Sequence, residues 1–163
     1  MNKNVLLGIC AIAAASAVAG CNRGTTYTSK DGSVTVEKKG GDRSSMTFTG
    51  KDGQKVEIDT GGGKVPNDFP KDMPVYECTK VVMSQSANEK HAHTLMLESG
   101  DPAGKIADFY KKGLESNGWK IEASINTAEM NMVTASKDQR QAVVQVMNGP
   151  DKRTINQVLS DKP

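Results

Sequence analysis

The chain has 163 residues, of which 25% are charged and 4% are aromatic, and its 21 basic and 19 acidic side chains give a formal net charge of +2. This near balance argues against a protein that binds nucleic acid or another polyanion, because such a protein would carry a clustered field of positive charge.

The N-terminus has the pattern of a bacterial export signal. A short polar start with one lysine precedes an uncharged run over residues 5–18, made mostly of Val, Leu, Ile and Ala. The run is long enough for the apolar segment of a secretory signal, but it is shorter than the roughly 20 residues that a membrane-spanning helix needs. It closes on Val18-Ala19-Gly20-Cys21, an aliphatic residue, two small residues and a cysteine.

This closing sequence resembles the lipobox of bacterial lipoproteins. The resemblance implies that residues 1–20 are a signal peptide and that Cys21, the first residue of the mature chain, is the site of lipid attachment. A plain secretory signal does not need the cysteine, and an uncleaved anchor helix would be too short. Two or more acyl chains would hold the mature chain stably at a membrane. In lipoproteins an aspartate after the cysteine is the usual signal to stay in the inner membrane, so Asn22 favours the outer membrane.

Removal of the leader changes the cysteine count and the charge. Cys10 leaves with the leader and Cys21 is acylated, so Cys78 is left as the single free thiol. One thiol excludes a framework of intramolecular disulfides. We expect Cys78 to pack as a small apolar side chain. The loss of Lys3 lowers the net charge from +2 to +1.

Residues 22–65 contain nine glycines and few large apolar side chains. The sequence over 26–32 is closely repeated over 47–53, and in each copy Asp-Gly lies between segments of alternating residues, which is a β-hairpin signal. We therefore predict two short hairpins within a tether over 21–64. Hairpins with so little to bury are marginally stable, which favours a semi-ordered stalk. The alternative is a surface that pairs with strands of a partner.

Residues 65–163 hold the tryptophan and most of the Val, Ile, Leu and Met side chains, and their number suits one small domain. Three prolines spaced by four residues open this region and predict an extended segment lying across the domain surface. Alternation of apolar and polar residues predicts the strands, which cover residues 79–84, 93–97, 119–125, 129–136 and 141–147, with a last strand over 155–159 left open.

One amphipathic helix is predicted after the second of these strands. Asp101 suits the N-cap, Pro102 suits the first helical position, and Asn117-Gly118 supplies the stop. The apolar stripe of this helix consists of Ile106, Phe109, Tyr110 and Leu114. Short connections between consecutive strands favour antiparallel pairing. The predicted fold is therefore α+β, a small antiparallel β-sheet packed on one α-helix in the order ββαβββ, preceded by a glycine-rich β-hairpin stalk.

A second resemblance covers residues 65–125. The sequence Val-Pro-x-Asp-Phe-Pro-Lys-Asp-Met-Pro-Val-Tyr is followed about thirty residues later by Asp-Phe-Tyr-Lys-Lys-x-Leu-Glu-Ser-Asn-Gly-Trp. The pair of motifs is similar to a family of uncharacterised bacterial envelope proteins, many of them lipoproteins. In that family Pro-Gly-Ala tends to follow the tyrosine, where this chain has Glu77-Cys78-Thr79. The resemblance implies a fold but no activity, so it assigns no catalytic residues.

The sequence does not favour an enzyme. Cys78 and the pair His91 and His93 are conceivable as a nucleophile and base, since their strands could be neighbours. The sequence has no recognisable nucleophile elbow, zinc-protease helix or phosphate-binding glycine loop. We therefore assign no catalytic residue.

A copper site is the more specific of two ligand hypotheses, the other being an unidentified small ligand. His91 and His93 lie on the same side of a predicted strand, with Met96 nearby, and Met130 and Met132 repeat the same spacing. Imidazole and thioether ligands suit Cu(I). In the alternative reading the methionines fill the core and the histidines lie in an exposed loop. This alternative is favoured, so no metal ligand and no cofactor are assigned.

The function predicted from these patterns is a membrane-anchored lipoprotein of the cell envelope, facing the periplasm. It would act without catalysis as a structural or interaction component, with a protein partner in the envelope and no nucleic acid. The alternative is a periplasmic module that binds a small ligand or copper. A continuous exposed apolar patch would favour a protein partner, and a closed pocket near His93 or Met132 would favour a ligand.

Overall fold

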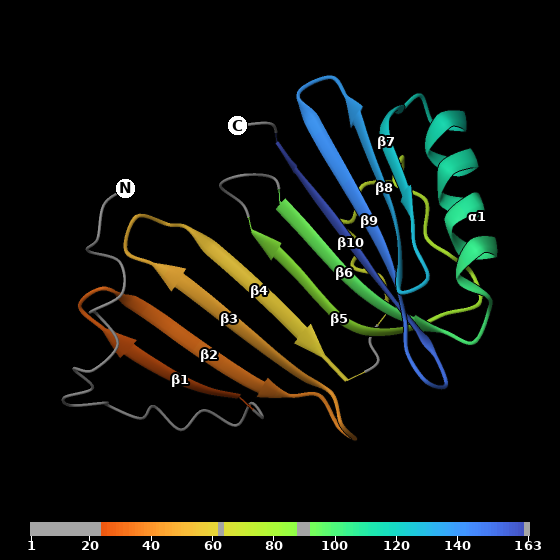
Figure 1. Cartoon of the computed structure of the whole chain (residues 1–163). Helices are drawn as coiled ribbons and strands as arrows, with labels where there is room; N and C mark the ends of the chain where they lie inside the picture. Colours follow the sequence, from red (N-terminus) through yellow and green to blue (C-terminus); the bar gives the residue numbers. More distant parts are fainter. Residues whose placement is uncertain (1–23, 62–63, 88–91, 162–163) are drawn as a thin grey trace.

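The computed structural model describes residues 24–61, 64–87 and 92–161 (Figure 1). Within these ranges the chain forms ten strands and one helix: β1 (Gly24–Ser29), β2 (Gly32–Lys38), β3 (Ser44–Gly50), β4 (Lys55–Thr60), β5 (Lys80–Ala87), β6 (Ala92–Ser99), α1 (Ala103–Ser116), β7 (Lys120–Asn126), β8 (Met130–Lys137), β9 (Arg140–Asn148) and β10 (Arg153–Asp161).

All ten strands belong to one antiparallel sheet, in the order β1-β2-β3-β4-β5-β6-β10-β9-β8-β7. Strands that follow each other in the chain are neighbours in the sheet, except for β6 and β7 on either side of α1, which are separated by β8, β9 and the last strand, β10. This last strand inserts between β6 and β9, so that Gln157 lies opposite both Leu95 and Val144. The sheet is thus assembled from local hairpins that one long-range strand joins.

The predicted fold class is wrong, because the chain builds one large sheet where we expected a small one behind a stalk. The expected hairpins are present as β1-β2 and β3-β4. However, β4 also pairs with β5, with Val56 opposite Ala87 and Thr60 opposite Met83. In a free hairpin, the outer backbone groups of β4 would form hydrogen bonds with water. Here they pair with β5 and extend the sheet. The boundary that we drew at residue 64 between two domains stays a prediction.

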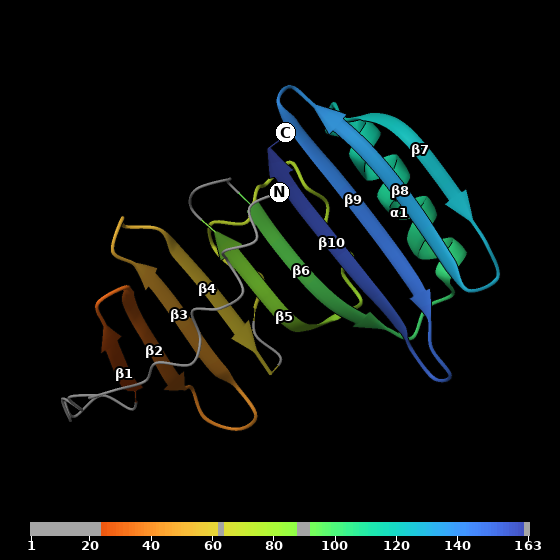
Figure 2. The same cartoon turned by 60° about the vertical axis from the view of Figure 1, so that its left-hand side comes forward.

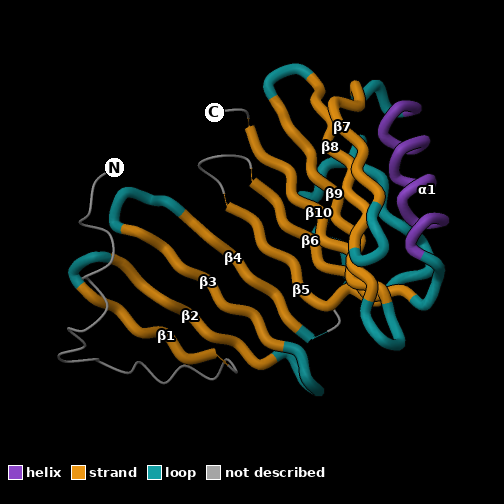
Figure 3. The backbone as a smooth tube through the Cα atoms, viewed as in Figure 1, coloured by secondary structure: helices purple, strands orange, loops and turns teal. Residues whose placement is uncertain are grey.

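Part of one face of the sheet is covered by α1, which packs against β7, β8 and β9, and by the irregular segment 64–79 (Figure 3). Every buried strand residue lies on this face, which we call the covered face. The core between these layers is built mainly from Leu95, Leu97, Ile106, Tyr110, Leu114, Trp119, Val144, Val146, Ile155 and Leu159, with Phe69, Met73 and Tyr76 from the irregular segment.

The predicted helix is confirmed over Ala103–Ser116, and Asn117 is its C-cap. Ile106, Tyr110 and Leu114 are fully buried, as the apolar stripe requires. Phe109 is only partly buried, and its ring lies edge-on to those of its aromatic neighbours, 5.0 Å from Tyr76 and 5.3 Å from Tyr110 between centroids. The stripe is therefore correct, but Phe109 lies at its margin.

The predicted N-cap is wrong. Pro102 occupies that position, and no side chain caps the helix. The Asp101 carboxylate instead accepts hydrogen bonds from the Tyr76 hydroxyl at 2.5 Å and from Lys105 at 3.0 Å. These bonds, first the one from Tyr76, lower the pKa of Asp101. Asp101 thus fastens the irregular segment to the start of α1.

The proline-rich segment folds into two tight turns, although we expected an extended segment. The amide of Phe69 donates to the carbonyl of Pro66 at 3.1 Å, and the amide of Met73 donates to that of Pro70 at 3.0 Å. These turns bring the Phe69 and Met73 side chains into the core. The segment crosses the surface of the sheet, as predicted, and it is part of the hydrophobic core.

Candidate functional site: the uncovered face of the sheet

The second face of the sheet carries exposed or partly exposed apolar side chains at positions from β1 to β9 and on β7, with polar side chains between them. Directly paired residues of antiparallel strands point to the same side, so the register shows which side chains share this face. Figure 2 looks onto it, with α1 behind the sheet. Every described strand residue on this side is at least partly exposed. We call it the uncovered face.

Five methionines lie on the uncovered face of β5, β6, β8 and β9. Met83 lies directly opposite Met96, and Met130 lies directly opposite Met147. Met132 pairs with Ile125 on the neighbouring strand. We call these side chains the methionine patch: Met83, Met96, Ile125, Met130, Met132 and Met147. Unbranched, polarisable methionine adapts to irregular apolar surfaces and is frequent where one site accepts several ligands.

Two amides interrupt the methionine patch at its centre. Asn156 on β10 lies between Met96 on β6 and Gln145 on β9, and Gln145 in turn lies opposite Met132. The Gln145 amide nitrogen lies 3.8 Å from the sulfur of Met132. The side-chain oxygen of Asn156 is buried and has no hydrogen-bond partner among the described residues. Apolar side chains with a few polar groups among them match the lining of small-molecule sites in composition, although here they lie on an open face and those sites are concave.

The uncovered face continues over the two hairpins with a different set of apolar side chains. We call this set the hairpin patch: Tyr27, Val34, Val36, Met46, Phe48, Val56 and Ile58. Its three most exposed members are Tyr27, Phe48 and Met46, which are 51%, 39% and 36% exposed. Where β4 pairs with β5, Ile58 of the hairpin patch lies opposite Gln85, and Met83 of the methionine patch lies opposite Thr60.

Two hollows beside β4 and the irregular segment are lined mainly by polar and charged residues. One of about 370 Å³ is lined by Glu57, Asp59, Pro66, Asn67, Asp68, Ser84 and Ser86, and one of about 280 Å³ adjoins it through Asp59 and Asn67. Two of their carboxylates already pair with lysines, Asp59 with Lys39 at 2.9 Å and Glu57 with Lys55 at 3.2 Å. These ion pairs occupy two of the carboxylates that a ligand in the hollows could otherwise contact.

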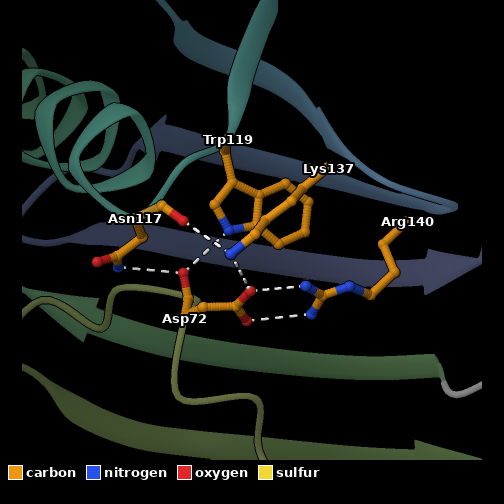
Figure 4. A network of polar contacts seen from close by, with 5 residues as sticks. All are labelled: Asp72, Asn117, Trp119, Lys137 and Arg140. Carbon is orange, nitrogen blue, oxygen red and sulfur yellow. Dashed lines mark hydrogen bonds and ion pairs between the residues drawn. The ribbon is translucent and has the colours of Figure 1, made fainter.

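A polar cluster around Asp72 holds the covered face together (Figure 4). The Asp72 carboxylate accepts two hydrogen bonds from Arg140, at 2.6 and 3.0 Å, and one from Lys137 at 2.8 Å. Its backbone carbonyl accepts from the Trp119 indole at 3.0 Å and from the Asn117 amide at 3.1 Å. The Arg140 guanidinium also lies 5.0 Å from the centre of the Trp119 ring. Asp72 thus ties the proline-rich segment to the end of α1 and to β8 and β9.

The cluster also makes the stability of the fold sensitive to acid. The hydrogen bonds from Arg140, and then the one from Lys137, lower the pKa of Asp72 from 3.8 to about 2. Because this pKa is lower in the folded chain than in the unfolded one, the stabilisation is present above about pH 4 and is lost as the pH falls toward 2. The side chains of Asp72, Lys137 and Arg140 are 26–27% exposed, so solvent screens part of their attraction.

We expect Asp72→Asn to lower the free energy of unfolding by about 1–2 kcal/mol at pH 7 and by progressively less below pH 4. The variant keeps the backbone carbonyl that binds Trp119 but lacks the titrating carboxylate. Urea unfolding of both proteins at pH 7, 4 and 2 measures the difference. A difference that stays constant over this range would contradict the assigned role of the ionised carboxylate.

The structure separates the proposed copper ligands. His93 points to the covered face, where its ring lies edge-on to Phe69 at 5.9 Å, whereas Met96, Met130 and Met132 are on the uncovered face. His91 lies outside the described residues. Within the described part of the chain, no three His, Cys, Asp or Glu side chains are grouped as a metal ion would require.

The cysteine and histidine considered as a catalytic pair are far apart. Cys78 precedes Lys80, which pairs with Glu98, whereas His93 pairs with Ser86 near the other end of β5. Six residues along a strand correspond to about 20 Å. The packing predicted for Cys78 is wrong, since this residue is exposed. Cys21, the predicted site of lipid attachment, lies outside the described residues.

Sequence reasoning missed the central residues of the uncovered face. Gln145 and Asn156 were not singled out, because each is an ordinary polar residue in an alternating strand. The sequence pattern of the methionines indicates only metal ligands or core residues. The available signal was their position, since Met130, Met132 and Met147 all occupy the side of β8 and β9 that faces away from the core.

No helix within the described ranges is both long and apolar enough to span a membrane. Comparison with known proteins gives one similarity. The model of a family described as START domain-like matches residues 80–154, slightly less than half of the chain. This stretch begins at β5, includes α1 and ends in β10, so it carries the whole methionine patch. No curated protein and no solved structure matches the chain.

Proposed function

We propose that this chain is a membrane-anchored, non-enzymatic module of the cell envelope that binds an apolar small molecule on its methionine patch. The observation that carries the proposal is the position of this patch, which lies entirely within the START domain-like stretch 80–154. Binding there would bury adaptable thioether side chains that are now partly exposed to water.

The central amides suggest which apolar molecules would bind best. The side-chain oxygen of Asn156 accepts no hydrogen bond from the described residues, and it lies between Met96 and Gln145. A ligand with one hydroxyl or amide N–H could donate to this oxygen while its apolar part contacts the methionines. An unpaired buried acceptor costs about 1–3 kcal/mol, and pairing it would recover part of that cost. We therefore propose an apolar molecule with one hydrogen-bond donor.

A titration with a neutral naphthylamine dye tests the site. The emission of this dye rises in apolar surroundings. The protein used is residues 21–163 with Cys21→Ser, which carries no acyl groups. Met96→Glu should weaken binding about tenfold or more, because a carboxylate in the patch would lose water on binding. Met96→Leu and the matched control Met46→Glu, on β3, should change the affinity less than about threefold. Equal losses for Met96→Glu and Met46→Glu would contradict the assigned position.

Competition with two unlabelled molecules tests the hydrogen bond. A long-chain alcohol should displace the dye better than an alkane of equal length, and Asn156→Leu should remove this preference. A preference that survives in Asn156→Leu would assign the polar contact to another group, with Gln145 as the nearest candidate.

A second candidate is a protein partner, and the open shape of the uncovered face favours it. The patch lies on an open face of the sheet instead of in a closed pocket, and exposed apolar side chains on an open face are typical of a surface that another protein covers. Under this second hypothesis, the folded partner protein would displace the dye. Neither the alcohol nor the alkane would displace it.

A further inference from the structure

The two hairpins have one polar and one apolar side. On the side continuous with the covered face, β1 to β4 present only polar and charged side chains: Thr26, Thr28, Ser33, Thr35, Glu37, Ser45, Thr47, Thr49, Lys55, Glu57 and Asp59. On the uncovered face these strands present the hairpin patch. The apolar side chains of β1 to β4 therefore contribute to no core within the described residues, and their apolar side faces outward.

The hairpin patch carries little charge. The one charged side chain that the four strands add to this side is Lys38, at the end of β2. The most exposed members of the hairpin patch include Tyr27 and Phe48, two of the six Tyr and Phe side chains in the chain. Contiguous apolar surface of this kind marks a contact with another protein or with lipid. A flat aromatic surface with a lysine at its border suits the boundary between lipid headgroups and acyl chains.

The position of the predicted lipid anchor favours lipid over another protein as the partner of the hairpin patch. Cys21 precedes Gly24, the first residue of β1, by three residues. Three residues of extended chain span at most about 11 Å. β1 is an edge strand of the sheet, and Tyr27 lies on it. A chain acylated at Cys21 would therefore hold β1 at the membrane surface, without the spacer that a stalk would provide.

The anchor and the border lysine lie at the same end of the hairpins. Gly24 pairs with Glu37, so the start of β1 lies beside the end of β2, where Lys38 follows. A lysine at this position can reach the headgroup phosphates while the apolar side chains beside it contact the acyl chains.

We propose that the hairpin patch lies on the lipid surface of the membrane that holds the Cys21 anchor. The acyl chains fix the edge of the sheet, and Tyr27, Phe48 and Met46 bury their exposed area in the boundary between headgroups and acyl chains. The hairpins then orient the module on the membrane. The proposal uses the predicted anchor and is independent of any ligand on the methionine patch.

Fluorescence quenching in vesicles tests the proposal with the acylated chain. Phe48 and Thr49 are neighbours on β3, both are exposed, and they point to opposite sides of the sheet. Each is replaced by Trp in vesicles that contain brominated phospholipid, and the emission of the unchanged protein, from Trp119, is subtracted. Tyr27→Trp on β1 is a second reporter in case Phe48→Trp disturbs the strand.

The emission of Phe48→Trp and Tyr27→Trp should fall by roughly half or more, because an apolar face in this position reaches about 5–10 Å into the lipid boundary. Thr49→Trp should be nearly unaffected. Equal quenching of Phe48→Trp and Thr49→Trp would overturn the proposal. A blue-shifted but unquenched Phe48→Trp would also overturn it, because the patch would then be covered by protein, a second copy included.

Labelling with radioactive palmitate verifies the starting point. The wild-type chain should incorporate the label and Cys21→Ser should not. Equal labelling of the two proteins would overturn the proposal, since it would remove the anchor from Cys21. The result of the dye titration described above is independent of this proposal, because the titration uses the unacylated chain and a substitution on β6.

Discussion

Gly61→Ala should lower the free energy of unfolding by about 3–5 kcal/mol, a large effect for one added methyl group. Gly61 has a φ of +89°, which an alanine adopts only with strain. A Cβ atom at this position would lie 1.9 Å from the backbone carbonyl oxygen of Asp42, in the loop between β2 and β3. The loop or the end of β4 must therefore move. Chemical denaturation of the mature chain measures the loss.

Gly53→Ala is the matched control for this prediction. Gly53 has a similar φ of +83°, but a Cβ atom there would meet no other atom within 4 Å. Gly53→Ala should therefore lower the free energy of unfolding only by the backbone strain, about 1 kcal/mol. The amide of Gly61 also donates to the carbonyl of Val82, on the neighbouring strand β5. If Gly61→Ala and Gly53→Ala had equal effects, the close approach to Asp42 would have to be relieved without cost.

Tyr110→Phe should lower the free energy of unfolding by about 2–4 kcal/mol, although it removes a single oxygen atom. Tyr110 is fully buried, and burial raises the pKa of its hydroxyl. The hydroxyl oxygen accepts hydrogen bonds from the Tyr76 amide at 3.2 Å and from the Gln157 side chain at 2.7 Å. Phenylalanine would leave both donors in the core without an acceptor. Equilibrium unfolding in urea measures the effect.

Two further variants check the explanation. Tyr27→Phe removes the same atom from an exposed side chain and should change stability by less than about 0.5 kcal/mol. Tyr110→Phe combined with Gln157→Leu should be more stable than Tyr110→Phe alone, because the double variant replaces one unsatisfied donor with an apolar group. If Tyr110→Phe were as mild as Tyr27→Phe, the hydroxyl would not be the link between α1 and β10 that we describe.

The local elements of the fold could be predicted from the sequence. Alternating residues around Ile121 and Val133 indicated strands, and the spacing of Ile106, Tyr110 and Leu114 indicated the buried side of α1. These patterns depend on neighbours in the chain, so a single sequence contains them. The Asp-Gly repeat indicated both hairpins for the same reason.

The connection between the elements could not be predicted in the same way. The pairing of β4 with β5 joins the hairpins to the rest of the sheet across the intervening segment 61–79, and no local pattern reports it. The apolar side of the hairpins has a weak sequence signal, because each strand contributes only one or two residues to it, such as Tyr27 on β1. These residues form a surface only after four strands have paired. The Asp72 cluster was missed because its partners are as many as 68 residues away.

The place of β10 in the sheet bears on the order in which the protein can assemble as it is synthesised. The strand lies between β6 and β9, yet it is the last strand of the chain. Until residues 153–161 have emerged, β6 and β9 each have an unpaired edge, and the strands before α1 share no backbone pairing with those after it. A nascent chain must therefore hold two open half-sheets, and chaperones or proteases that recognise strand edges have their best access at that stage.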